Sequence, residues 1–164
     1  MKRTGRLRDD TITLSYNVNL TSPCLLTNRF INTYSGSEAE KIILNVSSGA
    51  GRHPVDAWSC YCGAKAGLDL FSKTVALEQS ITGGGYKIFS IGPGVVDTEM
   101  QDEIRKLDKS EFSRVDEFIG YKEKGQLADP KWIADEYIEI IDHSNDIKEV
   151  VFSINEYEKM KQGK

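Results

Sequence analysis

Residues 41–51 read Lys41-Ile42-Ile43-Leu44-Asn45-Val46-Ser47-Ser48-Gly49-Ala50-Gly51, an almost continuous apolar run that ends in two serines and small residues. Buried strands of parallel sheets have this composition, because helices cover both of their faces. The small residues after the run predict an open loop at the carboxyl end of the strand. Open α/β sheets bind their ligands at that end, so Ser48 is expected to lie where a ligand would bind.

Strand and helix patterns alternate along the rest of the chain, which is typical of the α/β class. We predict strands over residues 41–47, 86–91 and 148–154. We predict helices over residues 10–34 and 59–80, in pieces around 101–107 and 114–122, and from Asp129-Pro130 onward. Asp9 or Asp10, Ser59 and Asp129 are the expected amino-terminal caps of the long helices.

Tyr61 and Lys65 lie four residues apart at the start of the second predicted long helix. This spacing places both side chains on one face of the helix, so the Lys65 ammonium is expected within a few ångströms of the phenol. A nearby cation favours the phenolate, and we therefore predict that Lys65 lowers the Tyr61 pKa. A tyrosine with such a pKa suits proton transfer. Tyrosine and lysine at this spacing also occur on ordinary solvated helix faces.

The predicted strand 86–91 runs into Gly92-Pro93-Gly94-Val95-Val96-Asp97-Thr98. We expect a turn rich in backbone donors, at the same edge of the sheet as Ser48.

Asn19 lies in the first long helical pattern, four residues before Pro23. Proline has no amide hydrogen, so the carbonyl of Asn19 loses its helical partner. We predict that this carbonyl holds a water beside Lys65, which would give a proton path from solvent to Tyr61. In the simpler alternative, Pro23 only bends the helix and Asn19 caps a turn.

The order Asn19, Ser48, Tyr61 and Lys65, followed by Pro93-Gly94 and Thr98, resembles the short-chain dehydrogenase/reductase family. Ser48 precedes Tyr61 by 13 residues, as in that family's catalytic tetrad. The stretches Ala76-Leu77-Glu78-Gln79, 93–101 and 153–157 look most like the sepiapterin reductase and benzil reductase branch. The resemblance implies the carboxyl-terminal part of a doubly wound, parallel-sheet, Rossmann-type α/β domain.

The resemblance also implies a reaction, in which hydride passes from the reduced form of NADP, or possibly of NAD, to a carbonyl compound. Tyr61 would donate a proton to the developing alkoxide, Ser48 would donate a hydrogen bond to the same oxygen, and Lys65 would hold the nicotinamide ribose. The cofactor-contacting residues would be Tyr61, Lys65, Pro93, Gly94, Val96 and Thr98. Ser48, Trp58 and Met100 would contact the substrate, which we expect to be a ketone, a diketone or a pterin side chain.

The sequence departs from the family pattern at its start, which lacks the glycine-rich turn that holds the cofactor pyrophosphate. Gly83, Gly84 and Gly85 follow a helix and precede a strand, so they indicate a helix stop. We therefore interpret residues 1–164 as one partial Rossmann-type domain. The alternative is a catalytically inactive fragment or dimerisation module. The strand 41–47 would have an open edge, and Gly63, Ala64, Ala66 and Gly67 would allow close helix contact.

The composition of the chain argues against several classes of binding partner. A net charge of −4 argues against nucleic acid, and no apolar run approaches the roughly 18 residues that span a bilayer. Cys24, Cys60 and Cys62 lack disulfide-framework spacing, so we expect a cytoplasmic protein. With two histidines, a zinc site has few ligands, and no metal is expected. Residues 45–49 lack the first glycine of the nucleophile elbow found in serine hydrolases, which argues against acyl transfer.

In full-length form we expect a homodimer or tetramer that binds a small-molecule carbonyl substrate.

Overall fold

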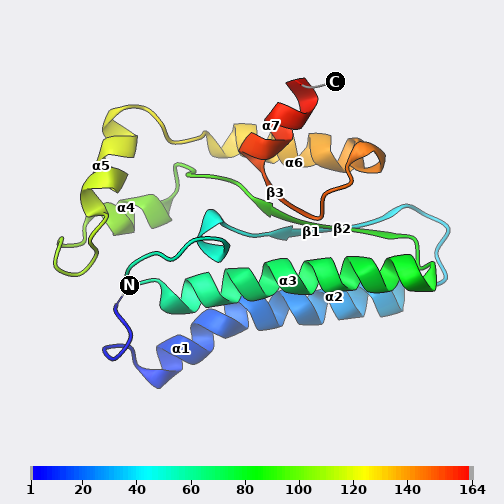
Figure 1. Cartoon of the computed structure of the whole chain (residues 1–164), viewed down its shortest axis with the longest axis horizontal. Helices are drawn as coiled ribbons and strands as arrows, with labels where there is room; N and C mark the ends of the chain where they lie inside the picture. Colours follow the sequence, from blue (N-terminus) through cyan, green and yellow to red (C-terminus); the bar gives the residue numbers. More distant parts are fainter. Residues whose placement is uncertain (1, 163–164) are drawn as a thin grey trace.

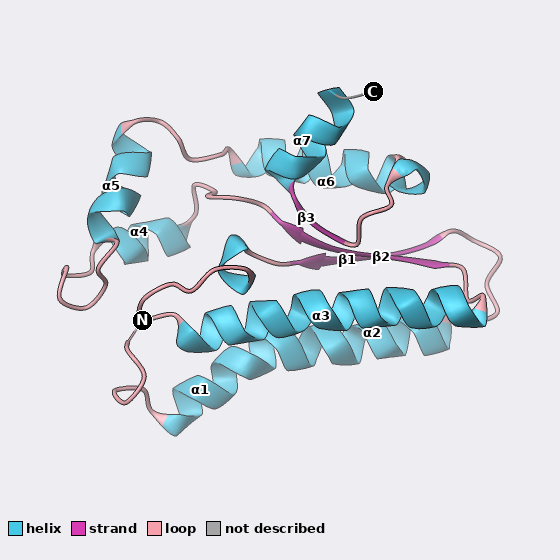
Figure 2. Ribbon diagram, in the orientation of Figure 1, coloured by secondary structure: helices cyan, strands magenta, loops and turns pink. Residues whose placement is uncertain are grey.

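The computed structural model describes residues 2–162 (Figure 1). Its three-stranded parallel sheet has the order β1 (Lys41–Val46), β2 (Tyr86–Gly92) and β3 (Val151–Ser153). In Figure 2 one face is covered by α1 (Asp9–Tyr16), α2 (Ser22–Thr33) and α3 (Ser59–Thr82), and the other by α6 (Pro130–Asp142) and α7 (Ile154–Gln162). The remaining helices, α4 (Glu99–Arg105) and α5 (Val115–Glu123), lie beyond the carboxyl ends of the strands. The predicted α/β class with a doubly wound parallel sheet is confirmed.

Two predicted strands agree with the structure to within one residue, whereas the third is shorter than predicted. β3 ends at Ser153, and α7 begins at Ile154. The carboxyl end of β3 is set by a capping box: the Ser153 amide donates to the Glu156 carboxylate at 2.7 Å, and the Glu156 amide donates to Ser153 Oγ at 3.3 Å. These reciprocal bonds turn the chain into a helix directly after the strand.

The predicted amino-terminal caps are correct at only one of three helices. The Asp129 carboxylate accepts from the Lys131 amide at 2.8 Å, as expected. Arg8, not Asp9 or Asp10, is the residue before α1, and both aspartates lie in the first turn of that helix. Trp58 precedes α3, while the hydroxyl of Ser59 lies 2.7 Å from that of Thr4 instead of capping the helix.

The first predicted helix is continuous but changes its hydrogen-bond pattern before Pro23. Residues Asn17–Thr21 form a π-helical segment, in which the Ser22 amide donates to the Asn17 carbonyl five residues earlier. A proline cannot donate to the carbonyl four residues before it, and the wider turn accommodates that missing donor. The helix therefore passes from α1 to α2 without breaking.

Three apolar clusters hold the layers together. Between the sheet and α6 and α7 lie Phe89, Ile91, Ile133, Ile140, Phe152, Ile154 and Tyr157. Between the sheet and α3 lie Val75, Tyr86 and Ile88. A third cluster consists of Ala50, Trp58, Ile104, Phe112, Val115 and Phe118. This third cluster holds α4 and α5 over the carboxyl ends of the strands, because it joins their side chains to the loop before α3.

The outer edge of β1 has no partner strand within residues 2–162, as expected. The small residues of α3, however, are used within the chain. A Cβ on Gly63 would lie 2.6 Å from the Tyr16 hydroxyl, and one on Gly67 would lie 3.0 Å from Leu20 Cδ2. The expectation that these two glycines serve contact with a second chain is therefore wrong, since the chain's own first helix covers them.

The loop after β1 packs directly on the backbone of α3 through Gly51. A Cβ at this position would lie 2.9 Å from the carbonyl carbon of Lys65 and 3.0 Å from the amide nitrogen of Ala66. The Lys65 Nζ also donates to the Val46 carbonyl at 2.8 Å. The end of β1 is thus fixed against the turn of α3 that follows Tyr61.

We predict that Gly51→Ala lowers the free energy of unfolding by about 1–3 kcal/mol, because the added methyl meets backbone atoms that cannot rotate away. Urea unfolding followed by circular dichroism measures this change. Gly49→Ala is the matched control in the same turn, since a Cβ there has nothing within 4 Å. Equal stability of the two variants would contradict the close contact.

Candidate active site

A cleft of about 540 Å³ opens at the carboxyl ends of β1 and β2. Its walls include the loop after β1, the start of α3, the turn after β2, and α4. Its lining includes the predicted residues Ser48, Trp58, Tyr61, Pro93, Gly94, Val96, Thr98 and Met100. The structure therefore brings most of the predicted site residues together, whereas Lys65 and Asn19 are not among the lining residues.

Ser48 and Tyr61 both line the cleft. Ser48 begins the short 3₁₀ helix after β1, and its Oγ accepts from the Ala50 amide at 3.2 Å. Burial raises the pKa of the Tyr61 phenol, and a hydrogen bond with the Ser48 side chain opposes that rise. A phenol with a raised pKa keeps its proton at neutral pH. The pair therefore presents two hydroxyls, one of which is a protonated acid, to the cleft.

Lys65 lies one turn beyond Tyr61, on the face of α3 that meets the sheet. Its side chain is 9% exposed, and its Nζ lies 5.6 Å from the centre of the Tyr61 ring. Burial lowers the pKa of the Lys65 ammonium, whereas the Asp69 carboxylate raises it. The predicted lowering of the Tyr61 pKa by Lys65 is wrong in this arrangement, because burial dominates and the ammonium is bonded to the Val46 carbonyl.

The same face of α3 continues as a polar seam that the sequence analysis missed. Asp69, four residues after Lys65, accepts from the Ser90 hydroxyl of β2 at 2.7 Å. Ser72 accepts at 3.0 Å from the amide nitrogen Nδ2 of Asn45 in β1. All four side chains are buried. Stepping four residues along the helix from Tyr61 through Lys65 reaches Asp69, and this spacing is the signal that would have found it.

Asn19 lies in the π-helical segment and does not line the cleft. Its side-chain amide donates to the Ser15 carbonyl at 3.0 Å, within its own helix. The side chain is half-buried. A part for Asn19 in proton transfer stays a prediction.

The turn after β2 is open to the cleft and tied to the segment before α6. Gly94 has φ +83°, and a Cβ on it would have nothing within 4 Å. The Asp97 amide donates to the Ala128 carbonyl, and the Ala128 amide donates to the Val95 carbonyl, each at 2.9 Å. Thr98 Oγ1 lies 3.4 Å from the Val96 carbonyl, to which it donates. The turn is thereby held rigid along one wall of the cleft.

Trp58 forms the aromatic wall next to Tyr61. Its ring stacks on Phe112, with centroids 5.6 Å apart and planes at 1°, and meets Tyr61 edge-on at 5.6 Å. Phe118 of α5 packs against both Trp58 and Phe112. Met100 of α4 is 41% exposed and faces the same cleft. Trp58 therefore both lines the cleft and packs against Phe112 and Phe118.

Over residues 2–162, no group of three or more His, Cys, Asp or Glu side chains is placed to hold a metal ion. In the same part of the chain, every helix is too short or too polar to cross a membrane.

Known proteins that resemble this chain are short-chain dehydrogenases and reductases. The family model of the short chain dehydrogenases matches residues 1–109. The chain is 36% identical over 142 residues to benzil reductase ((S)-benzoin forming) of Bacillus subtilis (strain 168). The aligned residues make up 87% of this chain and 58% of that protein. It is 29% identical over 144 residues to sepiapterin reductase of Bos taurus, and this alignment covers 85% of this chain and 51% of that protein. The chain thus spans little more than half the length of these relatives.

Among solved structures, the chain resembles the KRED1-Pglu enzyme with a TM-score of 0.75 and 32% identity. The match covers 85% of this chain and 56% of that one. The sheet, the cleft at its carboxyl edge and the sequence matches agree with one another. The predicted resemblance is confirmed, and the chain belongs to the short-chain dehydrogenase/reductase family of oxidoreductases.

Proposed function

We propose that this protein reduces the carbonyl group of a small molecule to an alcohol, with NADP as the preferred cofactor. When bound, the nicotinamide supplies hydride to the carbonyl carbon. Tyr61 donates its phenolic proton to the developing alkoxide, and Ser48 donates a hydrogen bond to the same oxygen. The observation that carries the proposal is that Ser48 and Tyr61 both line the cleft at the carboxyl ends of the strands.

The residues at the cleft fit the nicotinamide end of such a cofactor. Gly94 leaves open space beside the turn, as a flat ring lying against the backbone requires. Val95 and Asp97 bond to Ala128, so the amide of Val96 between them is directed away from that bridge, and it would hold the carboxamide. Thr98 would contact the same group. An ammonium has three donors, and Lys65 has given one to Val46, so two remain for ribose hydroxyls.

The described residues offer no cradle for the pyrophosphate. None of the three strands leads through a glycine-rich turn directly into a helix within residues 2–162: β1 enters a 3₁₀ turn and a loop, β2 enters the turn at Pro93, and β3 enters α7 at once. We propose that residues 1–164 form one catalytic part of a Rossmann-type domain, and that Asn19 completes its proton path. Three free cysteines support a reducing, cytoplasmic location.

The substrate that we propose is an aromatic ketone, a diketone or a pterin side chain. Trp58, Phe118, Tyr121 and Met100 give the cleft an apolar lining. The relatives named above are a benzil reductase and a sepiapterin reductase, whose names point to carbonyl substrates of this kind.

We predict that Tyr61→Phe lowers the rate of carbonyl reduction by about 10²–10⁴-fold while cofactor affinity changes less than about twofold. Only the transferable proton is removed. The assay uses a chimera in which the amino-terminal part of the Bacillus subtilis benzil reductase precedes residue 1, with benzil as substrate and NADPH oxidation as the readout.

Lys65→Ala in the same chimera is the comparison for Tyr61→Phe. We expect this variant to weaken cofactor affinity and turnover together. A Tyr61→Phe variant that loses cofactor affinity as severely as turnover would make Tyr61 a structural residue and contradict its assignment as the acid.

A second candidate function, an inactive association module, is favoured by two surfaces. The outer edge of β1 lacks a partner strand among the described residues, and unpaired edges bind other strands. The first helices and α3 also expose apolar side chains to more than half of their area, namely Leu14, Val18, Leu25, Leu26, Leu70, Leu77 and Ile81. Such a face suits contact with a second copy, as a homodimer or tetramer requires.

We predict that the 164-residue chain alone shows no measurable affinity for NADPH or NADH and self-associates at micromolar concentration. Each charge-assisted hydrogen bond to a pyrophosphate contributes about 1.5–3 kcal/mol, so lacking several weakens binding by powers of ten. Calorimetric titration and light scattering measure both properties. Micromolar cofactor binding by a monomer would show that the pyrophosphate contacts are supplied by residues within this chain.

A further inference from the structure

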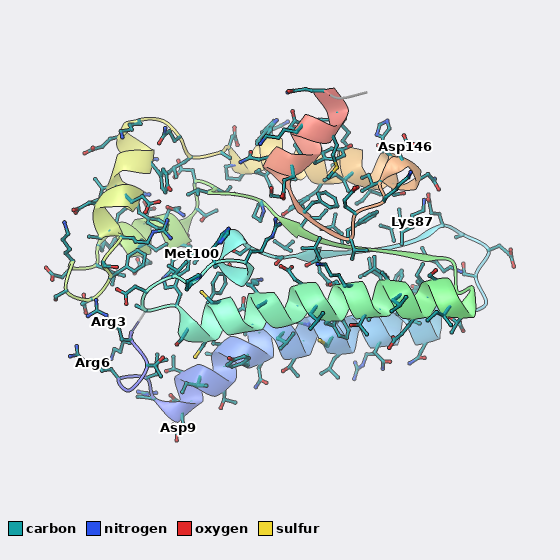
Figure 3. The ribbon with its side chains drawn as sticks, viewed as in Figure 1. Arg3, Arg6, Asp9, Lys87, Met100 and Asp146 are labelled. Carbon is teal, nitrogen blue, oxygen red and sulfur yellow. The ribbon has the colours of Figure 1, made fainter. Side chains whose placement is uncertain are left out.

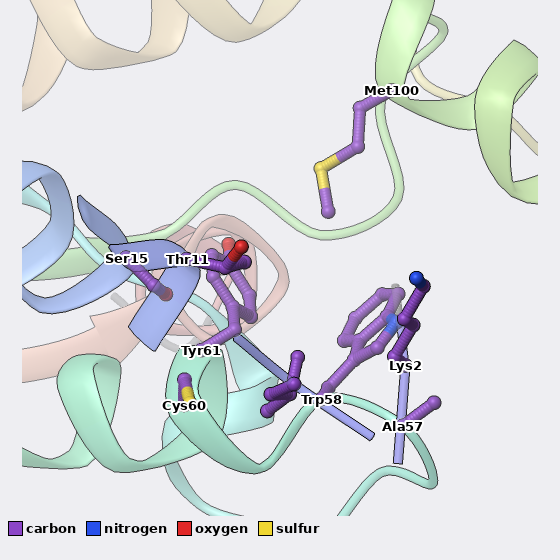
Figure 4. A pocket seen from close by; sticks show the side chains of 9 residues that line it. Lys2, Thr11, Ser15, Ala57, Trp58, Cys60, Tyr61 and Met100 are labelled. Carbon is purple, nitrogen blue, oxygen red and sulfur yellow. The ribbon is translucent and has the colours of Figure 1, made fainter. Parts of the chain in front are cut away.

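A smaller apolar crevice lies beside the cleft, with a volume of about 190 Å³ (Figure 4). Trp58, Tyr61 and Met100 line both spaces. The rest of the crevice wall comes from Lys2, Leu7, Thr11, Ser15, Ala57 and Cys60. In Figure 4 Met100 points from α4 toward Tyr61 and Trp58. A molecule held at Tyr61 therefore has the crevice within direct reach.

The amino-terminal wall of the crevice is fixed by an ion pair that joins three segments. Arg3 Nε and Nη2 donate to the two carboxylate oxygens of Asp56 at 2.9 and 3.0 Å, and Nη1 donates to the Ser110 carbonyl at 2.9 Å. The Asp56 carboxylate also accepts from the Ser113 amide at 3.1 Å. Figure 3 shows Arg3 beside the loop between α4 and α5. A bidentate pair of this kind fixes geometry, so the wall keeps its shape without a ligand.

Ala57 adds a second constraint on the crevice. Its φ is +60°, a left-handed conformation that residues with a Cβ rarely adopt. Such a residue persists where its neighbours over-determine the backbone, and here Asp56 is bound by Arg3 while Trp58 is stacked on Phe112. The small side chain of Ala57 consequently lies against the crevice between two fixed neighbours.

We propose that this crevice is a second substrate subsite, which takes a ring-sized apolar arm attached to the reacting carbonyl. The inference rests on the proposed function, because that function places the carbonyl oxygen at Ser48 and Tyr61. A cavity of about 150 Å³ lined by apolar side chains binds benzene, so the volume of the crevice suits a phenyl ring. Its walls are mainly aliphatic and aromatic carbon, with the stem of Lys2 at the rim. Met100, flexible and apolar, lies where the arm passes between the two spaces.

The test is a titration of the 164-residue chain with acetophenone, followed by the amide chemical shifts of ¹⁵N-labelled protein and performed without dinucleotide. Acetone, which has the carbonyl and no ring, is the small comparison ligand. We expect saturable shifts at Thr11, Ala57 and Cys60 with acetophenone, and an affinity for acetone at least tenfold weaker.

Thr11→Phe is expected to fill the crevice and weaken acetophenone binding at least tenfold. Thr13→Phe is the matched control: it makes the same change on the same helix at a residue outside the crevice lining. Ser15→Leu fills the crevice from a different position, and it replaces Thr11→Phe should that variant lose its folded amide spectrum.

Acetophenone binding that is equally strong in the wild type and in a folded crevice-filling variant would overturn the subsite, as would equal affinity for acetone. Binding that behaves as expected while the chimera described above reduces no carbonyl would overturn the proposed function instead, so the two failures are distinguishable.

Discussion

The contact between the end of β1 and α3 sets the geometry of everything at the carboxyl edge of the sheet. Gly51 lets the loop after β1 approach the helix backbone, and Lys65 ties the Val46 carbonyl to the same turn. Because Tyr61 lies one turn before Lys65, this contact also sets the distance between Ser48 and Tyr61. Backbone packing of this kind is stiff, so the two hydroxyls are held in place before any ligand arrives.

Burial, rather than the neighbouring ammonium, governs the protonation of Tyr61. The side chain lies among Trp58 and Met100, which removes water that would stabilise a phenolate, and the pKa rises. The Ser48 hydrogen bond works in the opposite direction. Lys65 is bonded to the Val46 carbonyl in this arrangement. A dinucleotide that drew the Lys65 ammonium toward ribose hydroxyls would change this balance, which links cofactor binding to the acidity of the phenol.

The sequence predicted the sheet and the grouping of the site because these depend on local patterns. The apolar runs of β1 and β2 indicated the sheet, and the resemblance to the family, which includes the 13-residue interval from Ser48 to Tyr61, grouped these two residues. α7 was missed because the β-branched residues before it hid the capping box at Ser153 and Glu156, a signal that was present in the sequence. The Arg3–Asp56 pair joins residues 53 positions apart, and no local pattern predicts it. The pKa of Tyr61 depends on burial, which spacing alone does not give.

Burial raises the pKa of Tyr61, and the Ser48 side chain opposes that rise. The most direct test is a pH titration of ¹³C-labelled tyrosine at position 61, in the wild type and in Ser48→Ala. We expect a Tyr61 pKa above the ordinary value of about 10 in the wild type and a still higher value in Ser48→Ala, because the variant removes the interaction that favours the phenolate. A wild-type value at or below about 10, or no change in Ser48→Ala, would contradict it.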